Sequence, residues 1–353
     1  MKNVLKKCLG LGLVAVLACS MVGCGSKATN GEIVVYNWGE YIDPEVNRMF
    51  TDETGIKVVY SEYANNEEMY AKVEQGNVSY DVIVPSDYMI EKMINNNLLA
   101  PLDFNQIPNY SNVDEEFKHL QFDPNDEYSV PYMWGTVGIV YNKKMVNEPV
   151  DSWDILWDDK YKDQIFMYDS ERDSIMVALK KLGYSMNTRN LDELEQAKEL
   201  LIEQAPLVLS YVGDEGKNKM VNEEAALMVA YAGDAMVMLE ENEDLDFVIP
   251  KEGSNYFVDS LVVPANASNK EGAYAYINFL CRPDIAAMNA EYIKYSTPIS
   301  AARELLPDEM KNSKVAYPSK DILGAANMEM FNDPSDIISE YSNIWTQVKT
   351  SNN

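Results

Sequence analysis

Histidine is almost absent from this chain, since His119 is the only one among 353 residues. A zinc site with two histidine ligands is therefore excluded, and a Ser-His-Asp triad would depend on this single side chain. The sequence also has no Gly-x-Ser-x-Gly turn, no Cys-x-x-Cys pair and no phosphate-binding Gly-x-x-x-x-Gly-Lys-Ser/Thr loop. Residues 123–127 resemble part of a calcium loop but lack its glycine and final glutamate. We therefore expect no catalytic residue, no metal and no cofactor, and we place His119 at the surface or between two lobes.

Cysteine is scarce too, and three of the four cysteines lie near the N-terminus. Lysines at positions 2, 6 and 7 precede an apolar run that ends in Gly23-Cys24, which is the order of an export signal and is too short for a membrane span. Cleavage before Cys24 would expose a thiol for lipidation. We therefore predict a lipoprotein signal over residues 1–23, a lipid-anchored polar tether over residues 24–31 and a location outside the membrane. A similar pattern before Cys19 and an ordinary secretory signal are the alternatives.

Only Cys281 would remain as a thiol in the exported body, so no internal disulfide can form there. The core must then be held by burial alone. About 330 residues can bury enough apolar surface for this, most readily as two domains. Cys281 lies in an apolar run and is expected to be a small buried hydrophobic residue.

Basic residues are few, with 29 Lys and Arg against 57 Asp and Glu, for a net charge of −28. Removal of the three signal lysines would take the net charge from −28 to −31. Nucleic acid is not expected as a partner, because its phosphates need Lys and Arg to replace their counterions. The acidity suits a cationic partner, although acidity also serves solubility alone.

No second long hydrophobic run follows the signal, and short β-type runs alternate instead with helical patterns. Residues 33–36, 44–54, 56–60, 66–75 and 80–85 predict strand, helix, strand, helix and strand, with a further helix through Leu98. Such an alternation predicts a parallel sheet. A second α/β unit is predicted from strands at 165–167, 207–211 and 227–231 and helices at 172–182, 191–204 and 235–241. Residues 132–140 and 257–264 have the β character of strands that pass from one lobe to the other.

Aromatic residues stand beside carboxylates in three places where predicted strands meet loops. Trp38, Glu40 and Tyr41 follow the first strand, Ser86, Asp87 and Tyr88 follow the third, and Tyr256, Phe257 and Asp259 enter a later one. Ligands of open α/β sheets bind at the carboxyl ends of the strands, so the first two groups should face one crevice. Aromatic rings at a lobe edge can also be ordinary packing. Three such groups without a catalytic set favour a cage for an ammonium ligand.

These segments resemble the spermidine/putrescine-binding proteins of bacterial polyamine ABC importers, from about Val34 to Lys349. The resemblance is carried by residues 36–41, Glu53–Val58, Tyr80–Ser86, Pro131–Gly135, Asp259–Ala267 and Thr297-Pro298. It implies an α/β, two-lobed periplasmic-binding-protein fold of type II, with a mainly parallel sheet and flanking helices in each lobe and the ligand in the interlobe cleft. The first lobe would comprise residues 32–134 and 258–300, and the second residues 135–257 and 301–353.

The resemblance also implies the residues of the site. Trp38, Tyr41, Ser86 and Tyr88 would form the wall of the first lobe, Asp259 would hold one ammonium end, and Asp173 would be a second carboxylate. Tyr231 and Phe257 fall where the family often has tryptophan, and Tyr295 matches a pocket tyrosine. Ser170 replaces an aspartate of the spermidine-preferring branch, although Asp169 is adjacent, and Phe331 replaces a glutamine. The choice between putrescine and spermidine therefore stays open.

The function expected from this resemblance is capture of a polyamine by a monomeric receptor that docks on a membrane permease. A receptor for another small cationic solute, such as a basic amino acid, is the first alternative. A secreted amine-handling enzyme is the second, and the lone histidine weighs against it.

Overall fold

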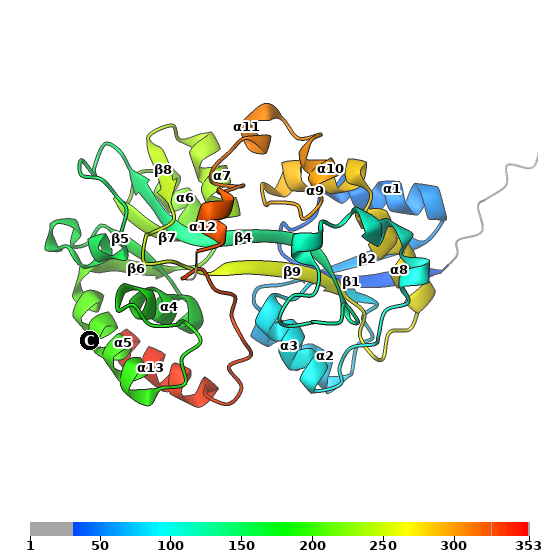
Figure 1. Cartoon of the computed structure of the whole chain (residues 1–353), viewed down its shortest axis with the longest axis horizontal. Helices are drawn as coiled ribbons and strands as arrows, with labels where there is room; N and C mark the ends of the chain where they lie inside the picture. The colour runs from blue at the N-terminus through cyan, green and yellow to red at the C-terminus, as the bar shows by residue number, and fades with distance from the viewer. Residues whose placement is uncertain (1–30, 326, 352–353) are drawn as a thin grey trace, which may run out of the picture.

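The computed structural model describes residues 31–325 and 327–351, so the predicted signal and Cys24 lie outside the described residues. Its strands are β1 (Glu32–Trp38), β2 (Lys57–Tyr63), β3 (Val82–Ile83), β4 (Ser129–Asn142), β5 (Ile165–Tyr168), β6 (Val208–Val212), β7 (Leu227–Tyr231), β8 (Leu245–Val248) and β9 (Tyr256–Val262). Within the described residues these nine strands form one curled sheet in the order β2-β1-β3-β9-β4-β7-β5-β6, with β8 beside β4. Figure 1 shows a lobe at each end of this sheet, and β4 and β9 run between the two lobes.

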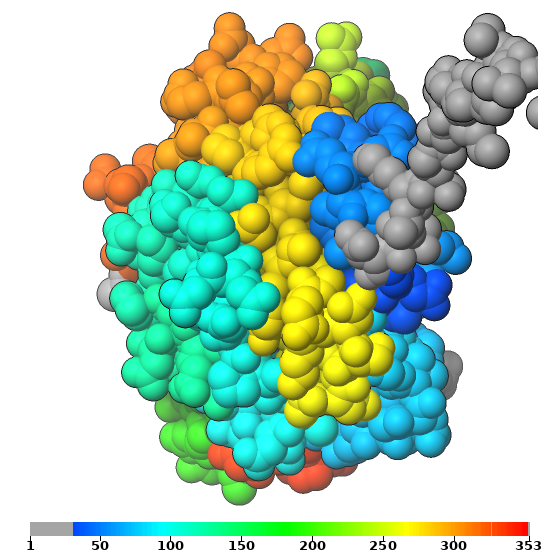
Figure 2. Space-filling model, turned by 90° about the vertical axis from the view of Figure 1, so that its right-hand side faces the viewer, coloured from blue at the N-terminus to red at the C-terminus, as the bar shows by residue number. Residues whose placement is uncertain are grey.

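The first lobe contains the parallel pairs β1–β2 and β1–β3, and β9 joins β3 in the antiparallel direction. Its helices are α1 (Pro44–Thr54), α2 (Asn66–Gln75), α3 (Asp87–Asn95), α8 (Lys270–Leu280), α9 (Pro283–Ile293) and α10 (Ser300–Arg303). Figure 2 shows the outer face of this lobe, where yellow segments from late in the chain lie between the blue and cyan segments from its start. The lobe is therefore assembled from two distant parts of the sequence.

The second lobe is built on the parallel pairs β5–β6 and β5–β7, with β7 and β8 antiparallel to β4. Its helices are α4 (Glu171–Lys181), α5 (Leu191–Gln204), α6 (Glu215–Val221), α7 (Ala232–Glu241) and the C-terminal α13 (Ile338–Thr350). The helices α4, α5 and α13 enclose a separate apolar cluster that includes Ile175, Leu194 and Ile344, each fully buried. The C-terminus of the chain is thus fixed to the lobe by a small core of its own.

The predicted start and end of the first helix are confirmed. The Asp43 side chain accepts a hydrogen bond from the Glu45 amide at 2.9 Å, and Pro44 takes the first helical position of α1, where its missing N–H costs nothing. Gly55 ends the helix with a φ of 75°, which suits glycine because it has no Cβ to clash. Val46 and Phe50 lie four residues apart and are buried on the same face.

In the part of the chain that the structure describes, three segments connect the lobes. β4 and β9 pair with each other from Ser129 to Thr136, and almost all of β4 is buried. The third connection is the C-terminal crossing segment, residues 327–337, which follows the short helices α11 (Asp308–Lys311) and α12 (Lys320–Leu323). Within it, the Asp333 amide donates to Glu91 of the first lobe at 2.6 Å, and the Met330 carbonyl accepts from Asn187 of the second at 2.7 Å.

Short 3-10 turns fill the remaining connections, at Phe104–Gln106, Pro108–Asn112, Glu115–Phe117, Trp153–Trp157, Asp159–Tyr161 and Ala205–Leu207. Among the described residues, no helix combines the length and the apolar character needed to cross a membrane. The predicted lobe boundaries stay predictions. The short helix α10 packs against α9 of the first lobe and extends past residue 300, where the first lobe was predicted to end.

Candidate functional site

Asp259 lies on β9, between the lobes, and is only 5% exposed. Its Oδ2 accepts a hydrogen bond from the Tyr41 hydroxyl at 2.8 Å, whereas Oδ1 has no hydrogen-bond partner within the described part of the chain. Burial raises the pKa of this carboxyl to about 6, against the opposite influence of the Ser86 and Tyr41 hydroxyls and the Arg172 charge. A buried carboxylate with an unpaired oxygen is ready to accept a charged donor.

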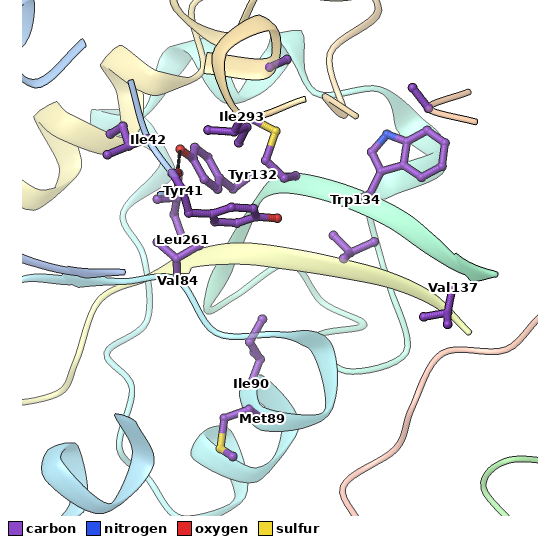
Figure 3. Close-up of a cluster of buried hydrophobic side chains, with 14 of the residues drawn as sticks. Tyr41, Ile42, Val84, Met89, Ile90, Tyr132, Trp134, Val137, Leu261 and Ile293 are labelled. Atoms are coloured by element: carbon purple, nitrogen blue, oxygen red, sulfur yellow. Dashed lines mark hydrogen bonds between the residues drawn. The ribbon is translucent and has the colours of Figure 1, made fainter. Parts of the chain in front are cut away.

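The wall around Tyr41 is aromatic. The Tyr41 ring makes edge contacts with Tyr132, at a centroid distance of 5.8 Å, and with Tyr295, at 5.1 Å. The Tyr132 hydroxyl donates to the backbone carbonyl of Tyr41 at 2.8 Å and so holds this loop against β4. Figure 3 shows Tyr41 and Tyr132 on one side of β4 and β9 and Met89 and Ile90 of α3 on the other.

The second lobe contributes Asp173, which is 1% exposed and lies in the first turn of α4. Its Oδ2 accepts from the Tyr231 hydroxyl at 2.9 Å and from the Ser170 hydroxyl at 2.6 Å. Its Oδ1 has no hydrogen-bond partner among residues 31–325 and 327–351. Tyr231 stacks on Tyr168 at 4.8 Å and meets Phe257 edge-on at 5.5 Å. The centre of the Phe257 ring lies 6.3 Å from that of Tyr295, and this contact links the aromatic wall of the second lobe to that of the first.

Tyr88 and Ser86 are joined through Asn66, which the sequence analysis did not identify. The Asn66 side-chain amide donates to the Ser86 hydroxyl at 3.1 Å and to the Tyr88 hydroxyl at 3.0 Å. The backbone of Ser86 also forms an isolated β-bridge with that of Asp259, so Asn66 links Tyr88 to the segment that lies beside Asp259. The Tyr88 hydroxyl in turn donates to Glu67 at 2.9 Å.

Trp38 and Glu40 stand apart from these contacts. The Trp38 indole N–H donates to the Val84 carbonyl at 2.8 Å, and its ring packs 4.8 Å from that of Tyr63. The Glu40 side chain is 90% exposed and has the Lys217 ammonium of the second lobe 4.0 Å away. The structure thus gathers Tyr41, Ser86, Tyr88, Asp173, Tyr231, Phe257, Asp259 and Tyr295 into one connected group, with Trp38 at its edge and Glu40 outside it.

Asp234 was also missed, because it reads as an ordinary acid in the first turn of a helix. In the structure it accepts hydrogen bonds from Tyr168 at 3.1 Å and from Tyr295 at 3.3 Å, and the Lys217 ammonium lies 3.6 Å away. Burial raises the pKa of Asp234. A signal was available in its position, since Asp234 comes three residues after the end of β7 at Tyr231, and side chains that follow a strand end are candidates for a site.

Two further charged residues lie beside Tyr88: Asp87, which the sequence analysis placed in the second aromatic and carboxylate group, and Arg172, which it did not place in the site. Asp87 is 1% exposed, accepts from the Tyr88 amide at 2.7 Å, and has its pKa raised to about 8 by burial. The Arg172 guanidinium lies 4.0 Å from the centre of the Tyr88 ring. The interface between the lobes is therefore acidic and aromatic, with a protein cation at one end.

His119 and Cys281 both lie away from this group. His119 is 67% exposed at the surface, with its Nδ1 3.1 Å from Asp126. Cys281 is buried as predicted, and burial raises the pKa of its thiol to about 12, so it is a poor nucleophile.

Comparison with known proteins identifies the architecture that carries this group of side chains. Residues 46–318 match the family described as bacterial extracellular solute-binding protein. The spermidine/putrescine-binding periplasmic protein of Escherichia coli K12 is 39% identical over 339 residues, which cover 94% of this chain and 97% of that protein. The chain belongs to the bacterial extracellular solute-binding protein family. The resemblance on which the sequence analysis relied is therefore confirmed.

Solved structures of other family members give the same fold. The spermidine/putrescine ABC transporter substrate-binding protein PotD of Streptococcus pneumoniae is 41% identical, with a TM-score of 0.82 over 92% of this solute-binding protein and 100% of that chain. The TpPotD lipoprotein of Treponema pallidum is 29% identical, with a TM-score of 0.82 over 90% of this chain and 99% of that chain. The predicted two-lobed α/β fold is confirmed, and so is the prediction of a binding protein rather than an enzyme.

Proposed function

We propose that this solute-binding protein captures a polyamine, putrescine or spermidine, and delivers it to the permease of an ABC importer. One observation carries the proposal. Asp259 of β9 and Asp173 of the second lobe are both buried, and each keeps one carboxylate oxygen without a hydrogen-bond partner in the described part of the chain. The Tyr231 hydroxyl donates to Asp173, and the Tyr231 ring meets that of Phe257, which precedes Asp259 by two residues on β9.

The chemistry of these groups matches that of a linear polyamine. Each unpaired carboxylate oxygen can accept an N–H from an ammonium group, and such a charge-assisted bond is about twice as strong as a neutral one. The aromatic rings can cover the methylene stem, and their faces attract positive charge. The net charge of −28 adds a long-range attraction for cations.

The proposal is supported by the names of the relatives, several of which are called spermidine/putrescine-binding or putrescine-binding proteins. A receptor for arginine or lysine would need a group that binds the carboxylate of the amino acid. Arg172 is the residue near Asp173 that could serve, so a basic amino acid is the alternative to exclude.

Native mass spectrometry of the exported chain in an equimolar mixture of putrescine, spermidine, arginine and lysine tests this directly. The expected result is a complex with the mass of one polyamine per chain and no amino-acid complex. A chain that retains arginine or lysine instead would contradict the proposal, and a chain that retains none of the four would contradict both functions.

We also propose that Cys24 carries the lipid that holds this monomeric receptor beside its permease. The support is the Gly23-Cys24 sequence, together with a structural relative that is itself a lipoprotein. Cys24→Ala should leave the folded body unchanged but move it from the membrane fraction to the soluble fraction. Metabolic labelling with palmitate checks the modification, and an unlabelled wild-type chain would refute the lipid anchor.

A further inference from the structure

Arg172 places a protein cation at the meeting point of both lobes and the C-terminal crossing segment. It is the second residue of α4, and its side chain is only 18% exposed. The guanidinium lies 4.0 Å from the centre of the Tyr88 ring, on the first lobe, and 5.0 Å from that of Phe331, on the crossing segment. Its two terminal nitrogens lie 3.7 Å from carboxylate oxygens of Glu67 and Asp173.

These surroundings have the composition of an ammonium site. Two aromatic rings and two carboxylates around one cation are the groups that would otherwise hold a ligand amine. The guanidinium is held by charge and ring contacts, because both ion-pair distances exceed hydrogen-bond length and Nε has no partner within the described ranges. A ligand amine directed to the same place would meet a like charge.

Among the remaining carboxylates between the lobes, two have an oxygen that can still accept a hydrogen bond from an amine. Oδ1 of Asp259 and Oδ1 of Asp173 have no hydrogen-bond partner among the described residues. Asp234 already has Lys217 and the hydroxyls of Tyr168 and Tyr295 beside it. Asp87 accepts from backbone amides with both of its oxygens.

We propose that Arg172 occupies the position of a third amine and so sets the length of the ligand, in favour of a diamine over a triamine. This inference rests on the proposed function, namely that a polyamine binds between the lobes. Arg172 acts here as a specificity-determining residue. Its cation satisfies Glu67 and one oxygen of Asp173 and leaves Asp173 Oδ1 for one end of the diamine and Asp259 Oδ1 for the other.

The test compares the dissociation constants of putrescine and spermidine by titration calorimetry for the wild type, Arg172→Met and Arg172→Lys. The wild type should bind putrescine more tightly. Arg172→Met removes the charge but keeps an apolar stem, and it should shift the affinity ratio toward spermidine by about tenfold, the size of a desolvated cation–ring contact. Arg172→Lys keeps the charge and should keep the wild-type ratio, which a merely space-filling role for the guanidinium would not predict.

Arg282→Met is the control, because Arg282 pairs with Glu53 at 2.8 Å and with Asp284 at 2.6 Å on the first lobe. The ratio of its putrescine and spermidine dissociation constants should equal that of the wild type. A wild type that prefers spermidine would overturn the inference whether or not the variants fold, as would an unchanged ratio in a folded Arg172→Met protein. A wild type that binds neither amine would instead refute the proposed function.

Discussion

The carboxyl of Asp259 combines a hydrogen bond from Tyr41 with an unpaired second oxygen, and burial raises its pKa from the ordinary 3.8 to about 6. An ammonium group binds the ionised form of the Asp259 carboxyl. Because polyamine nitrogens stay charged well above pH 8, the pH dependence of binding below that pH comes from the protein. Polyamine affinity should therefore be full above pH 7 and fall as the pH drops through about 6, approaching tenfold per pH unit. Asp87, with its pKa of about 8, stays mostly protonated through this range.

The free energy of unfolding of the ligand-free protein should change in the opposite direction, decreasing as the pH rises. Burial favours the protonated Asp259, so its contribution to stability is present below pH 3.8 and is lost as the pH rises through about 6. Binding titrations and urea unfolding between pH 5 and 8 check both statements. The Asp259→Asn variant should lose the pH dependence of binding and keep that part of the stability dependence that other buried carboxyls, such as that of Asp87, contribute. An affinity that stays constant down to pH 5 would contradict the assignment of Asp259.

For single residues, the sequence predicted the positions of side chains next to strand ends better than those of side chains whose partners lie on the other lobe. Ser86 could be placed near Tyr41 because β1 and β3 are parallel and end at one edge of the sheet, whereas Asp259 was placed in the site by the family resemblance. Asp234 and Arg172 could not, because their partners Tyr295 and Tyr88 come from the other lobe. Nothing in the sequence around a helical Asp or Arg reports what the opposite lobe brings to it.

The start of α7 lies against Tyr295 of the first lobe. A Cβ built on Gly233 would lie 2.0 Å from the ring of Tyr295, so this glycine is what allows the two elements to meet. Gly233→Ala should hold the lobes apart and weaken putrescine binding roughly five- to hundredfold, the equivalent of an overpacking cost of about 1–3 kcal/mol. The unliganded protein can relieve the clash by opening, so its melting temperature should change little.

The control for this substitution is Gly39→Ala, because a Cβ at Gly39 would meet nothing within 4 Å. Its affinity should match that of the wild type. Titration calorimetry and thermal unfolding of both variants provide the measurements. Unaltered binding in a folded Gly233→Ala protein would show that Tyr295 and α7 need not meet when the ligand is bound.

Elements with strong local signals were predicted closely, and elements that depend on distant pairing were not. The helix at residues 66–75 has the predicted bounds because Asn65 caps its start and Gly76, with a φ of 66°, ends it. β8 went unpredicted, since its four residues are held by pairing with β4 about a hundred residues earlier. The predicted strand at residues 80–85 was too long, because only Val82 and Ile83 enter the ladder.

For the whole molecule, the sequence predicted two α/β units and the two strands that pass between them, at residues 132–140 and 257–264, but not that these two strands pair with each other. β4 and β9 form one antiparallel pair that belongs to both lobes, so a single sheet replaces two separate ones. The C-terminal crossing segment is the least predictable part, because it has little regular structure and is fixed by side chains such as Glu91 and Asn187 from opposite lobes.

The central claim is that Asp259, buried between the lobes, holds one ammonium end of a polyamine. Titration of putrescine into the wild type and into Asp259→Asn at pH 7.5 tests it most directly. The wild type should bind one putrescine per chain, and the variant should bind it roughly ten- to hundredfold more weakly, as expected for loss of a charged hydrogen bond of about 1.5–3 kcal/mol. An Asp259→Asn protein that binds putrescine as tightly as the wild type would contradict the account.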